Sequence, residues 1–437
     1  MKDIDGSNTN DVFETSRYAE LVENPIMYSK PDFSSFNIKG MDILIAVYSP
    51  NGVHTAESVA PEIKKMMTAQ KNFLGQFNST KKYSVLIYLS DVSKQNNAHG
   101  FGALEHPTAT TVVLPEMMPI GELSDQLKDV VSHEFFHIVT PLSIHSKEIQ
   151  NFDYNDPNMS KHLWMYEGVT EYFANLFQVN QGLITEYDFF KRMAGKIENA
   201  ATMNDTIPFV TMSANVIVKP YKDQYLNVYE KGALIGMCID VLIREKSNGE
   251  RGILDLMQKL SAEYGPSKPF NDDELFGKIT SLTYPEVGQF LNTYVAGPTP
   301  IPYDSYFAKM GVTKINIKVP GIVFLKGQTP YITVNPETKE IMVLPEIELN
   351  DFFKTLGLKG KDYILGINDK PYNLDNIYEM IAISQSWKNG DPISIKIRRD
   401  GKEQVIKGTV ALSYEDKESY KFTDLSKEKL KDTWLKG

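Results

Sequence analysis

Two histidines four positions apart are the clearest candidates for chemistry in this chain, in the segment His133-Glu134-Phe135-Phe136-His137. On a helix, side chains at positions i and i+4 lie on one face, so both imidazoles can reach the same metal ion. Glu134 is then placed to take a proton from a water molecule bound to that ion. Zinc in catalytic sites lowers the pKa of such a water to about 7. The pattern therefore predicts a zinc-dependent hydrolase.

A catalytic zinc needs a third protein ligand and one open position. Glu167 follows His137 by 30 residues, which leaves room for a loop and a returning helix. His145 and His162 are alternative third ligands, although both lie in or beside a polar loop at 145–162. Glu171, one helical turn after Glu167, either binds a zinc-ligating imidazole through its far nitrogen or faces solvent.

The elements that must position these residues can be read from the apolar pattern. Leu127, Val130, Val131 and Ile138 form one stripe and predict a helix over 122–139. The same reasoning predicts further helices and, before them, strands rich in β-branched residues. The helices are expected at 58–77, 163–180, 226–246, 252–263, 272–281 and 284–295, and the strands at 36–48, 83–89 and 108–114.

Breaks in this pattern predict the domain boundaries. Three prolines in 297–303 cannot continue a helix, so a zinc peptidase domain is expected to cover 58–310. Residues 1–57 are expected to be an N-terminal segment that ends a β-rich domain. Strand patterns and the Asp400-Gly401 turn predict a small β-rich domain at 315–415, followed by a C-terminal tail at 416–437.

Several segments together resemble the glycyl aminopeptidase family of gluzincin metallopeptidases. The segments are Tyr18–Pro25, Gly102–His106 (G-A-L-E-H), the His133–His137 motif, Trp164–Gly168 (W-M-Y-E-G) and Tyr229–Ala233 (Y-E-K-G-A). They fall in the family's order, and the resemblance covers roughly residues 18 to 412. Residues 138–146 depart from the family's usual stretch, which puts its preference for an N-terminal glycine in doubt.

The resemblance implies roles for six residues of these segments. His133, His137 and Glu167 would hold Zn²⁺, with Glu134 as general base. Glu105 would bind the free α-ammonium of the substrate, which explains action at a chain end. Tyr229 would donate its phenolic hydrogen to the oxyanion of the tetrahedral intermediate.

The stretch from Gly357 to Asn368 resembles the corresponding segment of bacterial PDZ domains. Asp369 stands where that family usually has glycine, and Lys361 interrupts its Gly-Asp pair. PDZ domains bind peptides by adding a strand to a sheet edge, so a peptide ligand at 315–415 is one expectation. A purely structural appendage is the alternative.

The expected fold class is α+β, with a thermolysin-like (gluzincin) zinc peptidase domain followed by a PDZ-like domain. The expected function is a zinc metalloaminopeptidase acting on peptides with a free N-terminus. One alternative is a zinc endopeptidase on the same site. Another is a peptide-binding protein that works through its PDZ-like domain and carries a vestigial zinc site.

Composition excludes several other classes. The formal net charge of −10 argues against nucleic-acid binding, which needs a basic surface. The single cysteine, Cys238, rules out an internal disulfide and a cysteine-rich metal site. No stretch of 18 apolar residues predicts a transmembrane segment. We expect either an exported protein, in periplasm or cell envelope, whose export signal is absent from this chain, or a cytoplasmic one.

Overall fold

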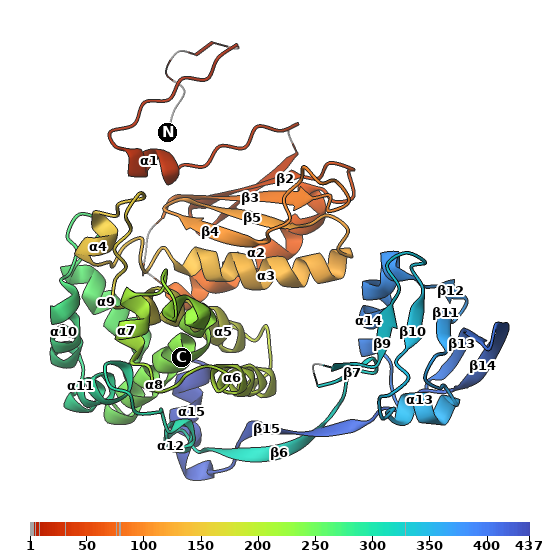
Figure 1. Ribbon diagram of the computed structural model, residues 1–437. Helices are drawn as coiled ribbons and strands as arrows, with labels where there is room; N and C mark the ends of the chain where they lie inside the picture. Colours follow the sequence, from red (N-terminus) through yellow and green to blue (C-terminus); the bar gives the residue numbers. More distant parts are fainter. Residues whose placement is uncertain are drawn as a thin grey trace. The chain divides into compact units, whose positions relative to one another are not determined.

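The structure is a computed structural model, and it describes residues 4, 6–7, 9–30, 32–75, 77, 80–327 and 329–437. The chain folds into two units (Figure 1). Unit 1 comprises residues 1–314 together with 420–437, and unit 2 comprises 315–419. Unit 1 contains every residue that the sequence places in the zinc site.

Unit 1 contains a five-stranded sheet with the order β1-β2-β3-β5-β4. The strands are β1 (Phe33–Ile38), β2 (Met41–Tyr48), β3 (Lys82–Ser90), β4 (Gly102–His106) and β5 (Ala109–Pro115). The three central strands run parallel, and β1 and β4 lie antiparallel at the two edges. The expected single strand at 36–48 is a hairpin instead, because Lys39 and Gly40 adopt positive φ angles and reverse the chain.

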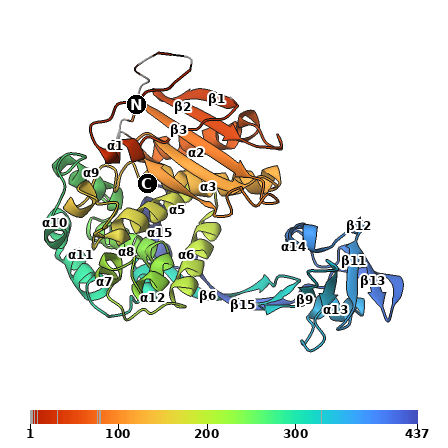
Figure 2. The same cartoon turned by 45° about the horizontal axis from the view of Figure 1, so that its top comes forward.

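Two helices cover one face of this sheet (Figure 2). Helix α2 (Ala56–Leu74) packs against β1 and β2, and helix α3 (Ile120–Phe136) packs against β4 and β5. Thr55 begins α2 with a capping box, since its side chain accepts from the Ser58 amide and Ser58 bonds back to Thr55. Helix α3 runs beside the edge strand β4.

The rest of unit 1 is helical. Its helices are α1 (Tyr18–Val22), α4 (Lys147–Gln150), η1 (Trp164–Val169), α5 (Thr170–Asn180), α6 (Glu186–Ala200), α7 (Phe209–Ala214), η2 (Tyr221–Val228), α8 (Glu230–Lys246), α9 (Ile253–Glu263), η3 (Asp272–Glu274), α10 (Leu275–Leu282), α11 (Pro285–Phe290), η4 (Leu291–Val295), α12 (Tyr303–Lys309), η6 (Leu425–Lys427) and α15 (Glu428–Leu435). Helix α8 lies at the centre, and its residues from Lys231 to Ile243 are all buried. Such burial on every side is typical of a core helix.

Unit 2 has its own sheet and its own hydrophobic core. Its sheet has the order β14-β13-β11-β10-β9, and β12 pairs with β11. The elements are β7 (Leu325–Lys326), β8 (Thr329–Pro330), β9 (Ile332–Val334), β10 (Ile341–Val343), α13 (Asp351–Leu356), β11 (Tyr363–Ile367), β12 (Lys370–Pro371), η5 (Leu374–Asn376), α14 (Ile377–Gln385), β13 (Pro392–Arg399) and β14 (Lys402–Thr409). The expected Asp400-Gly401 hairpin joins β13 to β14.

The chain enters unit 2 through β6 (Val312–Pro320) and leaves it through β15 (Tyr414–Phe422). These two strands pair with each other in a two-stranded sheet. The segment expected as a tail at 416–437 forms the end of β15 and helix α15, and Trp434 of α15 is fully buried in unit 1. The strands within the expected N-terminal segment 1–57 likewise belong to the main sheet of unit 1. Among the described residues, none of the helices combines the length and apolar character that crossing a membrane requires.

Candidate metal centre

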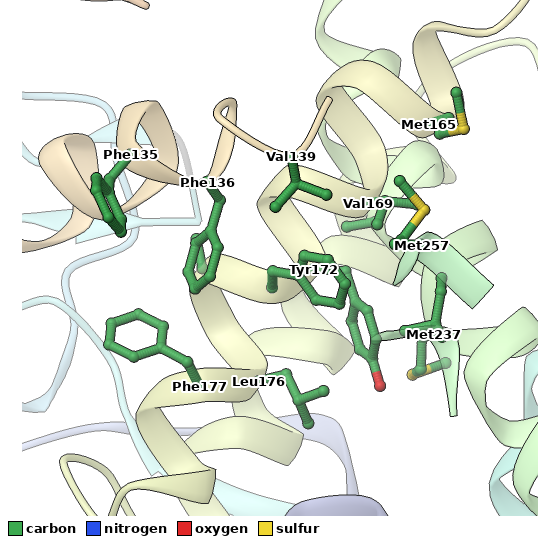
Figure 3. Close-up of a cluster of buried hydrophobic side chains, with 14 of the residues drawn as sticks. Phe135, Phe136, Val139, Met165, Val169, Tyr172, Leu176, Phe177, Met237 and Met257 are labelled. Carbon is green, nitrogen blue, oxygen red and sulfur yellow. The ribbon is translucent and has the colours of Figure 1, made fainter. Parts of the chain in front are cut away.

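Helix α3 positions the two histidines at its C-terminal end. Leu123, Leu127 and Val131 bury its apolar face, which holds the helix in register against its neighbours. The helix ends at Phe136, and His137 is its C-cap residue. Phe135 and Phe136, between the predicted ligands, are completely buried in the core shown in Figure 3. Because these aromatic rings are packed, His133, Glu134 and His137 have little freedom to turn away from the site.

Glu167 lies on η1, a short π-helical segment that leads directly into α5. Its neighbour Gly168 lies against the backbone of Gly232 on α8, and a Cβ atom on Gly232 would approach the Cα of Gly168 to 2.9 Å. Only glycines permit such a close approach of two helices. The two glycines therefore explain how η1, with Glu167, and α8, with Tyr229 at its start, can lie side by side.

The structure brings the three predicted metal ligands together. Their ligand atoms all lie within 4.8 Å of one another. The Glu167 Oε2 atom is 3.2 Å from His133 Nε2 and 3.6 Å from His137 Nε2. The other ring nitrogens have partners of their own: His133 Nδ1 lies 2.9 Å from Glu171 Oε2, and His137 Nδ1 lies 3.0 Å from the Thr140 carbonyl oxygen. Both Nε2 atoms are thus held toward Glu167.

This donor set fits zinc. Two imidazole nitrogens and one carboxylate oxygen are a usual protein ligand set of a catalytic zinc. The hydrogen bonds at the Nδ1 atoms are the outer contacts that orient such imidazoles. Glu171 therefore faces His133 rather than solvent, which resolves the alternative that the sequence left open.

The charges around His133 also favour a cation. Burial would lower the pKa of His133, but its hydrogen bonds to the carboxylates of Glu167 and Glu171 outweigh burial and raise that pKa well above its usual range. Burial would raise the pKa of Glu171, but Lys196 and His133 hold it well below its usual range. Carboxylates that attract a proton to His133 attract a divalent cation by the same Coulomb force.

The carboxylates of Glu134 and Glu105 also lie close to His137. One oxygen of each carboxylate and a ring nitrogen of His137 lie within 4.8 Å of one another. Burial raises the pKa of Glu134 to about 7, although His137 and His133 oppose this effect. The Oε2 atom of Glu134 is buried and has no hydrogen-bond partner among the described residues. Such a carboxylate is available to exchange a proton near neutral pH.

Tyr229 is the N-cap residue of α8, and its ring centroid lies 5.6 Å from that of His133. Its hydroxyl oxygen is 3.0 Å from that of Tyr225. Burial and the nearby Glu167 carboxylate raise the pKa of Tyr229 well above its usual range, so its phenol stays protonated. The structure therefore places a phenolic donor beside the candidate metal ligands.

The alternative third ligands lie elsewhere. His145 Nδ1 and Nε2 are 2.7 Å from the Pro141 carbonyl oxygen and from Gln150 Oε1, respectively. His162 Nε2 is 2.9 Å from the Asp272 carbonyl oxygen, and its Nδ1 accepts from the Trp164 indole. Since both nitrogens of each ring are engaged outside the site, neither histidine is a candidate ligand in this structure.

Two charged residues beside the site were missed by sequence reasoning. Lys196 on α6 contacts Glu171, and Glu230, the first residue of α8, contacts Lys196. No helix was expected at 186–200, although Thr185 and Asp188 form a capping box there. That signal and the amphipathic pattern after it predict the helix, but they do not predict which residues Lys196 meets.

Comparison with known proteins extends these observations. Residues 126–235 match the family described as M61 glycyl aminopeptidase. The matched segment contains His133, Glu134, His137, Glu167 and Tyr229, whereas Glu105 precedes it. No match was found among curated proteins.

Among solved structures, an aminopeptidase N family protein from Idiomarina loihiensis is similar over 92% of this chain and 70% of its own, with 18% identity and a TM-score of 0.59. At that identity the likeness establishes a shared fold. An M1 zinc metallopeptidase from Deinococcus radiodurans is similar over 63% of this chain at 15% identity, with a TM-score of 0.42, and the chain spans 53% of that structure. Residues 126–235, which contain the three candidate metal ligands, therefore match the M61 glycyl aminopeptidase family of metallopeptidases.

Proposed function

We propose that this chain is a zinc metalloaminopeptidase, which hydrolyses the first peptide bond of peptides that have a free N-terminus. The observation that carries the proposal is the convergence of two overlapping groups on His137. One group, with His133 and Glu167, offers metal ligands, and the other, with Glu134 and Glu105, offers two carboxylates beside them. A metal site with an adjacent base is the requirement for metal-assisted hydrolysis.

His133, His137 and Glu167 would hold the zinc ion, which supplies polarisation of the scissile carbonyl group and makes water more acidic. Glu134 takes the proton of the attacking water and later delivers it to the leaving amine. Its pKa of about 7 suits both steps near neutral pH. Tyr229 donates a hydrogen bond to the oxyanion as the carbonyl carbon becomes tetrahedral.

Glu105 distinguishes an aminopeptidase from other peptidases in this proposal. Its carboxylate lies on the edge strand β4, close to Glu134 and His137. A substrate α-ammonium paired with Glu105 would place the first peptide bond of the substrate next to Glu134. In a peptide, only the N-terminus carries an α-ammonium group.

The test is the hydrolysis of amino-acyl chromogenic substrates by the zinc-loaded full-length chain. We expect activity that is lost when the substrate α-amine is acetylated and lost in the Glu134→Ala variant. Activity retained in Glu134→Ala would contradict the role of Glu134. Equal hydrolysis of free and acetylated substrates would instead favour the alternative, an endopeptidase on the same site.

We also propose that unit 2 is a PDZ-like module that binds a peptide by strand addition. Strand β9 is an edge strand of its sheet, so it offers unpaired backbone groups. Helix α14 presents the exposed side chains of Tyr378 and Ile383. We expect labelled peptides to bind full-length Glu134→Ala protein in anisotropy titrations, and Tyr378→Ala to weaken that binding. Absence of binding would favour a purely structural role.

A further inference from the structure

Lys196 on α6 lies between two carboxylates that come from different helices. Its Nζ atom is 2.8 Å from Glu171 Oε1 on α5 and 3.6 Å from Glu230 Oε2 on α8. The Lys196 side chain is 12% exposed, and those of Glu171 and Glu230 are 22% and 20% exposed. An ion pair with this little solvent contact is screened less than a surface pair.

Each of these carboxylates is linked to a different residue of the site, Glu171 to His133 and Glu230 to Tyr229. Glu171 Oε2 accepts a hydrogen bond from His133 Nδ1 at 2.9 Å, so it fixes the direction of the His133 Nε2 atom. Glu230 directly follows Tyr229 and begins the helix that Tyr229 caps. Lys196 therefore forms ion pairs with Glu171, which orients a metal ligand, and with Glu230, which lies next to Tyr229 in the chain.

The surroundings leave Lys196 without a substitute. A pocket of about 300 Å³ opens beside it and is lined by the same carboxylates. Arg192, one turn earlier on α6, points to Asn175 Oδ1 at 3.2 Å and to Asp129 at 3.6 Å. Asn175 adds one neutral hydrogen bond to Glu171 Oε1 at 3.0 Å. The Oε2 atom of Glu230 is buried and has no hydrogen-bond partner among the described residues, so the nearby ammonium of Lys196 is its compensation.

We infer that Lys196 is a positioning residue that holds Glu171 against His133 and Glu230 beside Tyr229, so that α6 sets the zinc affinity of the site. The inference rests on the proposed function, because it takes zinc as the bound ion. Without the ammonium, Glu171 would keep Asn175 and His133, and Glu230 would keep the Asn199 amide, but the two carboxylates would lose the cation that they share. They would move apart or recruit water, and the imidazole of His133 would lose its fixed orientation.

The experiment measures the zinc dissociation constant of the full-length chain by competition with a chromophoric chelator. Removing an outer contact of a metal ligand weakens binding about 10- to 100-fold in known sites. Because Lys196 acts through Glu171, we expect the lower end, about tenfold, for Lys196→Met and for Lys196→Gln. Lys196→Arg should retain most of the affinity. Lys191→Met is the matched control, since Lys191 is an exposed lysine on the same helix.

A double-variant comparison separates positioning from a general loss of stability. If Lys196 acts through Glu171, the Glu171→Gln/Lys196→Met protein should bind zinc no more weakly than Glu171→Gln alone. Thermal unfolding of the zinc-free variants shows whether each is folded. If either Lys196→Met or Lys196→Gln does not fold, the other still allows the test. Additive losses, or unchanged affinity in both neutral variants, would overturn the inference. Failure of the unaltered chain to bind zinc would instead overturn the proposed function, and it is read without any variant.

Discussion

Two glutamates of the site, Glu134 and Glu171, differ in charge because their surroundings differ. Glu134 is buried with an unpartnered oxygen, and its pKa rises to about 7. Glu171 is partly buried, but Lys196 and His133 hold its pKa well below its usual range. A glutamate is thus suited to proton transfer at position 134 and remains negatively charged at position 171. Roles within this site follow from contacts, and residue type alone does not reveal them.

Replacing Tyr229 with phenylalanine tests the oxyanion donor. We expect the kcat of Tyr229→Phe to fall about 10²- to 10³-fold, as when one oxyanion donor is removed, while KM changes little. The ring itself keeps its place near His133, so zinc affinity should be unchanged. Steady-state kinetics on an amino-acyl chromogenic substrate give kcat and KM, and chelator competition gives the zinc affinity.

Tyr225 provides the matched control, because its hydroxyl oxygen lies 3.0 Å from that of Tyr229. Tyr225→Phe removes a neighbouring phenol without removing the proposed donor, so its kcat should fall much less. If the two variants lose equal activity, Tyr229 is not the specific donor that we propose.

The metal ligands could be predicted from the sequence because their geometry is local. His133 and His137 are one helical turn apart, and any helix there places them together. Glu167 required a returning helix, which the apolar pattern of 163–180 also predicts. The contacts of Lys196 could not be predicted, since they depend on how α5, α6 and α8 pack, and no spacing in the chain encodes that packing.

Among the elements, long helices and the Asp400-Gly401 turn were predicted closely, whereas the reversal at Lys39 and Gly40 was not. The expected helix at 122–139 corresponds to α3 (Ile120–Phe136), and that at 226–246 corresponds to η2 and α8. The hairpin at Lys39 and Gly40 was missed because a short apolar run does not reveal a two-residue turn. The π-helical form of η1 was missed as well.

The carboxyl ends of the parallel strands are joined by Glu116, which directly follows β5. Glu116 is fully buried, and it accepts hydrogen bonds from the Ser49 hydroxyl and from the amide and side chain of Asn51, just after β2. Burial would raise the pKa of Glu116, but the hydrogen bonds from Ser49 and Asn51 outweigh it and lower the pKa. A lowered carboxyl pKa stabilises the fold above the ordinary pKa, and this contribution is lost as pH falls through the lowered value.

Glu116→Gln should therefore destabilise the protein at pH 7 by about 2 kcal/mol, in the range for hydrogen bonds to a charged group. The difference from the unaltered chain should shrink as pH falls below about 4.5, the ordinary pKa of a glutamate. Urea unfolding at pH 7 and at pH 3.5 measures both values. The exposed Glu62 on α2 supplies the control, Glu62→Gln, which should have little effect. A loss of equal size at both pH values would contradict the charged role of Glu116.

At the scale of the molecule, unit 2 interrupts unit 1 between α12 and α15. The chain returns so that the indole of Trp434 donates to the Tyr172 hydroxyl at 2.7 Å, and that hydroxyl donates to Asp240 at 2.8 Å. Tyr172 follows Glu171 on α5, and Asp240 lies on α8, the helix that begins after Tyr229. Helix α15 therefore links α5, which carries Glu171, to α8, which begins after Tyr229. Sequence patterns alone could not show this, because α15 is short and its partners lie far back in the chain.

Two shortened chains test whether α15 belongs to the folding unit of the metal centre. In the first, residues 322–412 are replaced by a short glycine-rich turn, which the geometry allows because the Gly321 amide donates to the Ser413 carbonyl at 2.8 Å. This chain keeps β6, β15 and α15, so we expect it to fold, to bind zinc and to cleave small amino-acyl substrates like the full chain. In the second, the chain stops at Gly311 and lacks α15. Losing the buried Trp434 side chain alone costs about 3–5 kcal/mol, a large part of the usual stability of a domain.

We therefore expect the second chain to be insoluble or unfolded by circular dichroism, and to bind no zinc in chelator competition. Trp434→Ala in the full-length chain is the matched variant, because it removes the same contact while all elements remain. It should lower the midpoint of urea unfolding, and zinc should raise that midpoint again, since a ligand of the folded state stabilises it by mass action. If the chain ending at Gly311 folds and binds zinc as tightly as the full chain, α15 is dispensable. The hydrogen bond from Trp434 to Tyr172 then has no role in the metal centre.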